Sequence, residues 1–178
     1  MLDGSEGAAT LPRVLHVGCG GETLAAYDIE GIETRLDIDP RHKPDIVASM
    51  TDIPADVGGF DAVFCFHALE HLYPHEVPVA LANFLRVLRP GGAAIVVVPD
   101  LSGVMPTDEV LYDSPAGPVA GLDLYYGMRR LIPTMPFMAH HMGFLPPTLA
   151  AALSAAGFER VSTRRGYERN LTGYGYRP

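Results

Sequence analysis

The feature that most constrains the fold is a series of five short aliphatic and β-branched runs that no hairpin turn joins. Several runs are apolar at consecutive positions, which is typical of strands buried on both faces of a sheet. Because tight hairpins join antiparallel strands, their absence favours parallel neighbours. The runs are Arg13–Val17, Thr34–Ile38, Asp45–Ala48, Asp61–Phe66 and Ala93–Val98. We therefore predict an α/β fold built on a mostly parallel sheet.

The connections between these runs differ in length. His75–Leu88 predicts an amphipathic helix, because its large apolar residues fall on one helical face, and Arg89–Gly92 supplies a stop. Glu22–Glu33 has room for about three helical turns at most, and Pro40–Pro44 has room for none. We therefore expect the early crossover helices to be trimmed.

The second half of the chain changes character twice. Between residues 100 and 146 periodicity is lost and Pro, Gly, Met and Tyr accumulate, a composition that suits an ordered lid. Pro147–Ala156 then predicts a last helix, and Phe158–Thr163 and Leu171–Tyr176 predict two more strands. These patterns predict a Rossmann-like, doubly wound, seven-stranded sheet with a lid inserted between the fifth strand and the last helix.

Length and charge exclude several classes of protein. A chain of 178 residues fits one domain. We expect residues 1–178 to form a single domain, with a ligand-binding core at 12–99, the insertion at 100–146 and a C-terminal part at 147–178. The chain has 13 basic against 21 acidic residues and a net charge of -8, which opposes binding to nucleic-acid phosphates.

Nothing in the sequence predicts export or a membrane span. Met1–Leu11 lacks the basic and apolar pattern of a signal peptide, and no apolar run approaches the roughly 18 residues of a membrane helix. Cys19 and Cys65 fit neither a disulfide framework nor a zinc motif. We therefore expect a cytoplasmic protein that binds no membrane.

A glycine turn and a carboxylate predict a nucleoside site. Gly18-Cys19-Gly20 follows the first strand, and Asp37 lies 19 residues after Gly18 at the end of the next one. Glycines let the backbone approach a ligand closely, and a carboxylate at that place can accept hydrogen bonds from both ribose hydroxyls. Either element alone is common, so the prediction depends on the pair.

Five segments in a fixed order carry a resemblance to a known family. They are Val14–Gly20, Leu36–Pro40, Phe60–Val63, Leu69–Leu72 and Leu85–Gly92. Their succession resembles the class I S-adenosylmethionine-dependent methyltransferases, particularly the small group called type 11. The resemblance covers about residues 13–100, and the elements of residues 147–163 match the family's last ones. It implies that S-adenosyl-L-methionine is the cofactor and that its methyl group passes to an oxygen or nitrogen of a small-molecule acceptor.

The resemblance also implies which residues bind the cofactor. Gly18 and Gly20, with Cys19 between them, would line its amino-acid end. Asp37 would hold the ribose, and Ile38 would pack on the adenine. The remaining implied residues are Met50, Thr51 and Asp52 at the adenine edge, and His67 and Leu69 beneath the sulfonium and its methyl group.

Three positions depart from the family pattern. His16 stands where Asp or Glu is usual, and Glu22 stands where a third glycine often lies. No pyrophosphate has to be bound, so the missing glycine is tolerable. Ser49 occupies the usual place of an adenine-binding Asp, which leaves Asp52 or backbone groups for that contact.

Methyl transfer from a sulfonium chiefly requires an acceptor lone pair aligned with the methyl carbon. A hydroxyl or ammonium acceptor must also lose a proton, and histidine, with an ordinary pKa near 6.5, suits that task. We name His67, His71 and His140 as catalytic candidates, and His75 and His141 are further histidines of the same region.

A metal site is the alternative use of these histidines. His67, Glu70 and His71 are spaced i, i+3 and i+4, so on a helix they would share one face. Some metal-assisted methyltransferases use a similar Glu/His cluster. In most relatives, however, this segment is structural, and we therefore expect no metal.

The lid is rich in aromatic and sulfur-containing side chains. They could close an apolar acceptor pocket, or they could pack the lid onto the sheet or form the contact of a homodimer. The residues concerned are Tyr112, Tyr125, Tyr126, Met128, Met135, Phe137 and Met138.

Two other functions compete with an active methyltransferase. A cofactor-binding but inactive regulatory or partner protein would fit the trimmed crossovers and His16. A nicotinamide-dependent oxidoreductase fits less well, because the turn at Gly18–Thr23 lacks the last glycine of the pyrophosphate fingerprint. The fifth strand ends Val98-Pro99-Asp100, without the Asn/Asp-Pro-Pro-aromatic motif of amino-methylating DNA enzymes, which also argues against a nucleic-acid substrate.

Overall fold

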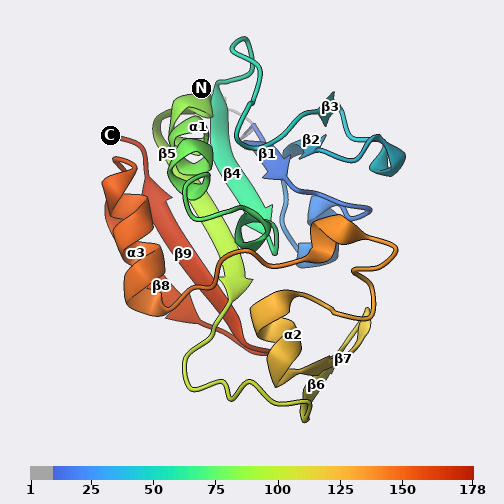
Figure 1. Cartoon of the computed structure of the whole chain (residues 1–178). Coiled ribbons are helices and arrows are strands. Elements are labelled where there is room, and N and C mark those ends of the chain that lie inside the picture. The colour runs from blue at the N-terminus through green and yellow to red at the C-terminus, as the bar shows by residue number, and fades with distance from the viewer. Residues whose placement is uncertain (1–9) are drawn as a thin grey trace, which may run out of the picture.

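The structure, a computed structural model, describes residues 10–178 and centres on a seven-stranded sheet (Figure 1). The strands are β1 (Arg13–Val17), β2 (Ile32–Asp37), β3 (Ile46–Val47), β4 (Phe60–Phe66), β5 (Leu88–Pro99), β8 (Glu159–Arg165) and β9 (Asn170–Tyr176). Their order is β3-β2-β1-β4-β5-β9-β8. The first five are parallel, whereas β9 is antiparallel to both β5 and β8. The predicted Rossmann-like, mostly parallel, seven-stranded sheet is confirmed.

Two α-helices cover one face of the sheet. α1 (Val77–Val87) leads from β4 to β5, and α3 (Pro146–Ala155) precedes β8; Figure 1 shows both on the same side. Their apolar sides pack on alternate strand residues, because side chains along a strand point to opposite faces in turn. Phe84 of α1 and Leu149 of α3 are both fully buried in this core. No helix within residues 10–178 is long and apolar enough to cross a membrane.

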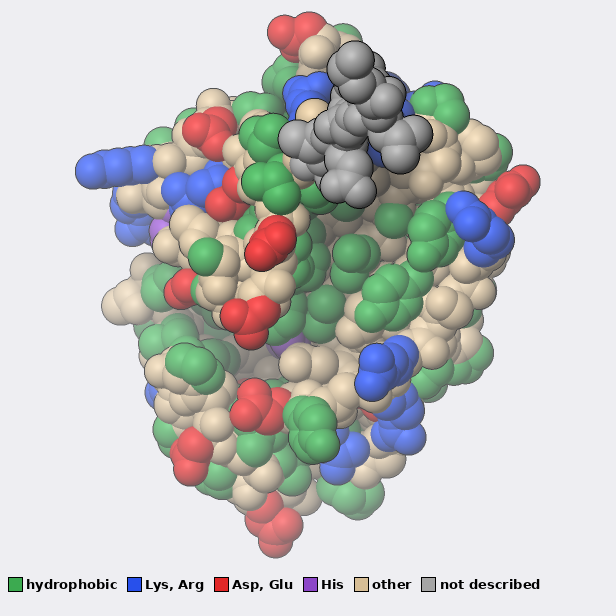
Figure 2. Space-filling model, turned by 180° about the vertical axis from the view of Figure 1, so that it is seen from behind, with side chains coloured by type: hydrophobic (Ala, Val, Ile, Leu, Met, Phe, Trp, Pro, Cys, Tyr) green, Lys and Arg blue, Asp and Glu red, His purple; other side chains and the backbone are tan. Residues whose placement is uncertain are grey.

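The opposite face of the sheet is covered much less. Of the helical elements in the described chain, only the 3₁₀ turn η1 (Leu24–Tyr27) contributes to the apolar cluster on this face. The ring of Tyr27 packs on those of Phe64 and Phe66. Figure 2 shows this face from behind, with hydrophobic side chains gathered over its middle. This face is lightly covered because the crossovers are short, as the sequence predicted. The β1–β2 connection contains only η1, and the β2–β3 connection contains only η2 (Pro40–His42).

The predicted lid lies between β5 and α3, beyond the carboxyl ends of the parallel strands (Figure 1). It contains a hairpin of β6 (Val110–Ser114) and β7 (Gly117–Ala120), a short helix α2 (Gly121–Tyr126) and a 3₁₀ turn η4 (Pro136–Met138). The lid has its own small core, formed by Val104, Val119 and Leu124 with Leu101, Tyr112, Tyr125 and Met128. Periodicity is weak in this segment because its elements are only a few residues long.

Predicted and observed bounds differ most at β5. Arg89–Gly92 was predicted as a stop, and α1 does end at Val87, but β5 begins directly at Leu88. The Gly91 N–H donates to the Arg177 carbonyl, and the Arg177 N–H donates to Gly92, both at 2.9 Å. The strand therefore runs through these glycines, with Gly91 at a φ of +78°, because the chain after β9 pairs with them.

Candidate functional site

A cavity of about 320 Å³ lies at the carboxyl ends of β1, β2, β3 and β4. Ligands of open α/β sheets bind at this edge. The volume lies within the range of small-molecule sites, about 300–1,000 Å³. The walls come from the residues that follow these strands, from η2 and from the lid turn η4.

The turn after β1 brings backbone to the cavity wall. Gly18 has a φ of +65°, and a Cβ there would lie 2.4 Å from the Cβ of Ala68. Gly20 has a φ of +53°, but a Cβ there would meet nothing within 4 Å. Gly18 therefore lets the turn pack against the segment after β4, while Gly20 leaves space open for a ligand.

Asp37 ends β2 and holds the glycine turn in place. Its Oδ2 accepts the Gly20 N–H at 2.7 Å, and its Oδ1 accepts the Asp39 N–H at 2.8 Å. The residue is 7% exposed and lines the cavity. Each carboxylate oxygen has a further lone pair, so both can still accept from a ligand. The structure thus brings together the glycine turn and the carboxylate that the sequence paired.

His16 lies outside the cavity and has a structural role. It is 1% exposed, and its Nδ1 lies 2.8 Å from the Glu33 Oε1, which also accepts the Leu24 N–H at 3.1 Å. Burial lowers the pKa of His16, although the Glu33 hydrogen bond and charge oppose that shift. Neutral His16 therefore donates from Nδ1 and ties β1 to β2 and, through Glu33, to η1.

The residues after β2 and β3 form the wall beside the carboxylate. Ile38, Ser49 and Met50 line the cavity, and the Ile38 side chain is largely exposed there. Thr51 turns aside to share a 2.8 Å hydrogen bond with the Ser49 hydroxyl, and Asp52 is exposed to solvent away from the cavity. Ser49, where relatives usually carry Asp, is thus nearer to the cavity than the predicted substitute, Asp52.

His67 follows β4 with a φ of +48°, a conformation that turns its side chain out of the strand. Its Nδ1 lies 3.2 Å from the Glu70 Oε1, and its Nε2 lies 2.7 Å from the Asn170 Oδ1. Both partners are acceptors, so the ring is held with a proton on each nitrogen. Burial alone would lower the pKa of His67, but the hydrogen bond and charge of Glu70, with Asn170, raise it above its ordinary value. A ring bonded in this way has no lone pair with which to accept a proton.

Glu70 is buried beneath the cavity among three histidines. It is 1% exposed, and its backbone carbonyl accepts the N–H groups of His141 and Met142, which anchors the lid. Burial would raise the pKa of Glu70, but the hydrogen bond from His67 and the nearby His71 and His140 lower it. Glu70 is therefore a buried carboxylate held in its charged form.

His71 and His140 have the same hydrogen-bond pattern. The His71 Nδ1 donates to the Ala139 carbonyl, and the His140 Nδ1 donates to the Leu124 carbonyl, each at 3.0 Å. Burial lowers the pKa of His140, so its ring is neutral. The His140 Nε2 then carries a lone pair, and with Nδ1 as the donor, Nε2 is also the atom of the His71 ring that is available to a ligand. His71 lines the cavity, whereas His140 lies behind it, with its Nε2 4.0 Å from the Glu70 Oε1.

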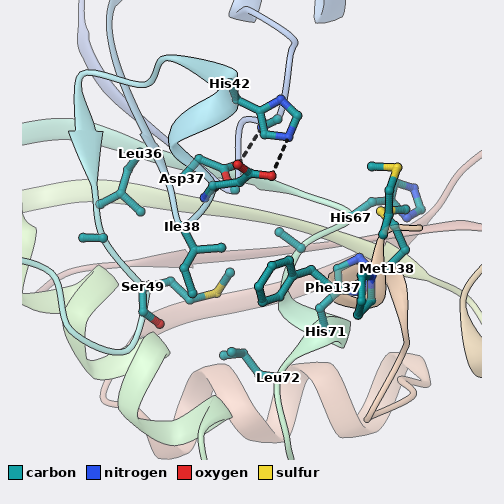
Figure 3. A pocket seen from close by; sticks show the side chains of 18 of the residues that line it. Leu36, Asp37, Ile38, His42, Ser49, His67, His71, Leu72, Phe137 and Met138 are labelled. Carbon is teal, nitrogen blue, oxygen red and sulfur yellow. Dashed lines mark hydrogen bonds and ion pairs between the residues drawn. The ribbon is translucent and has the colours of Figure 1, made fainter. Parts of the chain in front are cut away.

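The lid closes the cavity with apolar side chains. Met135, Pro136, Phe137 and Met138 line it. Figure 3 shows Phe137 between Ile38 on one side and His71 on the other. The other lid residues of this set lie elsewhere: Tyr112, Tyr125 and Met128 pack in the lid core, and Tyr126 is exposed. One part of the lid therefore lines the cavity, and the other part packs within the lid itself.

Most of the predicted cofactor residues lie on the cavity wall. Those that line it are Gly18, Gly20, Asp37, Ile38, Met50 and His67, together with the catalytic candidate His71. Cys19, Thr51, Asp52, Leu69 and His140 do not line it. Cys19 and Leu69 are buried, and Leu69 is fully enclosed in the core under α1, because the turn after β4 directs it inward.

Sequence reasoning missed the residues of η2. Asp39, Arg41 and His42 line the cavity next to Asp37. The Arg41 side-chain and backbone hydrogen bonds lower the pKa of Asp39 to about 2. The sequence did contain a signal, since Asp39-Pro40 is the usual start of a helical turn and directly follows the second strand.

Comparisons with known proteins agree with this architecture. Residues 15–96 match the sequence model of a family described as a methyltransferase domain. No curated protein matches the chain. The match covers most of β1, the strands β2 to β4, α1 and most of β5, and it includes all of the cavity lining except the lid residues.

Solved methyltransferase structures share the fold. The 1,6-didemethyltoxoflavin-N1-methyltransferase of Burkholderia thailandensis, with 1,6-didemethyltoxoflavin and S-adenosylhomocysteine bound, superposes with a TM-score of 0.62 at 18% identity, over 94% of this chain and 72% of that one. The N-methyltransferase NodS of Bradyrhizobium japonicum, with S-adenosylhomocysteine, gives 0.59 at 14%, over 95% and 79%. Human N-acetylserotonin methyltransferase, in complex with SAM, gives 0.59 at 14%, over 94% and 48%.

The chain spans only 48% of the human enzyme's length, and 62% and 51% of two other similar structures. At these identities the structural likeness establishes the fold. Together, the sequence match and the sheet order confirm the resemblance to the class I S-adenosylmethionine-dependent methyltransferases.

Proposed function

We propose that this chain binds S-adenosyl-L-methionine and transfers its methyl group to a small-molecule acceptor. The observation that carries the proposal is the cavity itself, which the buried carboxylate of Asp37 and the glycine turn share with His67 and His71. This geometry fits the cofactor because the sugar hydroxyls of a nucleoside can donate to both oxygens of Asp37. The solved relatives described above, which contain the cofactor or its product, support the same ligand.

Each wall of the cavity has a role in this proposal. The open backbone at Gly20 receives the amino-acid end of the cofactor, Asp37 holds the ribose, and Ile38, with Ser49 and Met50, borders the adenine. The cofactor has no pyrophosphate, so the exposed Glu22 in place of a third glycine removes no needed contact. His67 and Ala68 border the methyl end.

Transfer requires alignment of the acceptor, exclusion of water and, for many acceptors, removal of a proton. Positioning can contribute up to roughly 7–11 kcal/mol in the best cases. His67 is a poor proton acceptor, since both of its ring nitrogens already donate. His71 lines the cavity and has an uncommitted Nε2, so we assign to it the contact with the nucleophilic atom of the acceptor.

The acceptor is a small molecule in this proposal. The lid contributes the apolar surfaces of Met135, Phe137 and Met138 to a cavity of about 320 Å³, which suits a compact, partly apolar compound. A net charge of -8 disfavours a nucleic-acid substrate. We also propose that residues 1–178 act as one domain in which 100–146 select the acceptor. The homodimer stays a prediction.

Calorimetry and an acceptor screen test the proposal. We expect saturable binding of S-adenosylmethionine and of S-adenosylhomocysteine, and transfer of labelled methyl to at least one compound of a metabolite panel. Binding without any transfer would favour the alternative, an inactive regulatory or partner protein. Absence of cofactor binding would reject both functions.

A further inference from the structure

One group of side chains beneath the cavity is not explained by cofactor binding. Glu70, His71 and His140 each contribute one potential ligand atom, and these atoms lie within 4.8 Å of one another. They come from two distant segments, the 3₁₀ turn η3 (Leu69–His71) after β4 and the end of the lid. We propose that these three residues bind a divalent transition metal ion such as Zn²⁺.

One carboxylate oxygen of Glu70 is left without a partner inside the cluster. The Glu70 Oε1 is engaged by His67, but Oε2 is buried and has no hydrogen-bond partner among residues 10–178. A buried carboxylate oxygen without a partner is costly, because it has lost water and gained nothing in return. The Nδ1 atoms of the two nearby imidazoles are directed to backbone carbonyls, so neither Nδ1–H is available to this oxygen. A cation between the three groups satisfies all of them.

The surroundings of the two rings match those of metal-binding histidines. A ligating histidine usually donates its second ring N–H to a carbonyl or carboxylate, which sets the tautomer and the orientation of the ring. Ala139 and Leu124 accept those bonds here. Glu70 is likewise held by His67 through its other oxygen. Each of the three ligands therefore has the supporting contact that a metal site requires.

The spacing of the three side chains suits a four-coordinate ion once they close around it. Metal–ligand distances of about 2.0–2.2 Å at tetrahedral angles place donor atoms roughly 3.3–3.5 Å apart. The three donor atoms lie within 4.8 Å of one another, so binding requires them to close by no more than roughly 1.5 Å, which side-chain rotation can supply. Imidazole ligands favour a transition metal over Mg²⁺ or Ca²⁺, which prefer oxygen.

Three protein ligands leave one coordination position open, as in catalytic rather than structural zinc sites. His71 belongs both to the cluster and to the cavity wall, so the open position adjoins the cavity. If methyl transfer proceeds as proposed above, a bound ion would take over from the His71 ring and lower the pKa of an acceptor hydroxyl. This role rests on the proposed function, whereas binding of the ion does not.

The site differs from the one that the sequence suggested and set aside. In the sequence, the spacing grouped His67, Glu70 and His71 as the candidate ligands, and no metal was expected. In the structure, Asn170 and Glu70 occupy both nitrogens of His67, and His140 of the lid takes its place. An ion would therefore join the lid to the sheet.

Metal titration of the untagged, chelator-treated protein tests the proposal without cofactor or acceptor. We expect calorimetry to show saturable uptake of one Zn²⁺ per chain, and Co²⁺ to give a visible absorption band on binding. Zn²⁺ should also raise the thermal unfolding temperature, because it binds the folded state. No saturable binding of either ion would overturn the proposal.

Matched variants locate the site. Glu70→Gln keeps the volume of the side chain, and His140→Ala changes the lid alone; each should weaken Zn²⁺ binding by more than about 100-fold, since even loss of an outer contact costs 10–100-fold. His75→Ala, an exposed histidine outside the cluster, should leave binding unchanged. S-Adenosylmethionine affinity and near-ultraviolet circular dichroism report whether each variant is folded. If the Glu70→Gln protein does not fold, the Zn²⁺ affinity of the His140→Ala protein tests the site. Unchanged Zn²⁺ affinity in a folded His140→Ala protein would refute the site.

Discussion

Replacing Asp37 with alanine should weaken S-adenosylmethionine binding by about 10- to 150-fold. Both carboxylate oxygens already accept one backbone N–H each, at 2.7 and 2.8 Å, and each has a lone pair left for a sugar hydroxyl. Hydrogen bonds to a charged acceptor contribute about 1.5–3 kcal/mol, and 1.4 kcal/mol corresponds to a factor of ten. Isothermal titration calorimetry with the methyl donor measures the change directly.

The same substitution should also cost some stability, because the N–H groups of Gly20 and Asp39 lose their acceptor. Gly20 is only partly buried, so water can replace part of that loss, and we expect about 1–2 kcal/mol in urea unfolding. Asp61→Ala is the matched control. Asp61 accepts the Arg13 N–H at 2.6 Å and pairs with Arg89, but it lies at the start of β4, at the far end of the sheet from the cavity.

The two variants separate ligand binding from folding. Asp61→Ala should lose comparable stability and keep full cofactor affinity. If folded Asp37→Ala bound S-adenosylmethionine as tightly as the unmodified protein, the carboxylate would not hold the ribose, and the orientation of the cofactor proposed above would be wrong.

Three further predictions follow from the packing. Gly18→Ala should lower the free energy of unfolding more than Gly20→Ala, by about 1–3 kcal/mol, because only at Gly18 would the new Cβ overlap a neighbour; equal losses in urea unfolding would contradict this. Stability should decline as pH falls from about 7 to 5, since the lowered pKa of His16, which faces Glu33, Arg35 and Asp37, lets the unfolded chain bind a proton first. His16→Gln should flatten that decline in unfolding curves taken at several pH values, and an unchanged slope would exclude His16 as its source. Phe137→Ala should change stability by less than about 0.5 kcal/mol, because the side chain is 64% exposed, yet weaken ligand binding in calorimetry; a loss typical of a core residue would show that Phe137 supports the fold instead.

Local sequence patterns were sufficient to predict the architecture. Consecutive apolar positions in β1, β4 and β5 reflect strands that are packed on both sides. Each strand could therefore be recognised from its own residues. The short β1–β2 and β2–β3 connections limited the helices that could form there, and the lightly covered face in Figure 2 is the result. The glycine turn and Asp37 were also predictable, because strand ends of a parallel sheet meet at one edge.

The histidine network could not be predicted in the same way. His67 gains its second partner from Asn170, and the Glu70 cluster gains His140 from the lid. These contacts depend on how a long, weakly periodic segment returns to the sheet, which no local pattern encodes. Spacing along the chain had grouped His67 with Glu70 and His71. In the structure, tertiary packing places His140 next to Glu70 and His71 instead.

The bond between His67 and Asn170 joins positions 103 residues apart, and it makes the ligand site depend on the placement of the C-terminal strand. Asn170 opens β9, which has to insert between β5 and β8 and pair with both. Until that insertion occurs, the imidazole lacks its second acceptor and β5 keeps a free edge. Partly folded forms of the chain should therefore lack a finished binding site, which would make acquisition of ligand affinity a late and specific reporter of complete refolding.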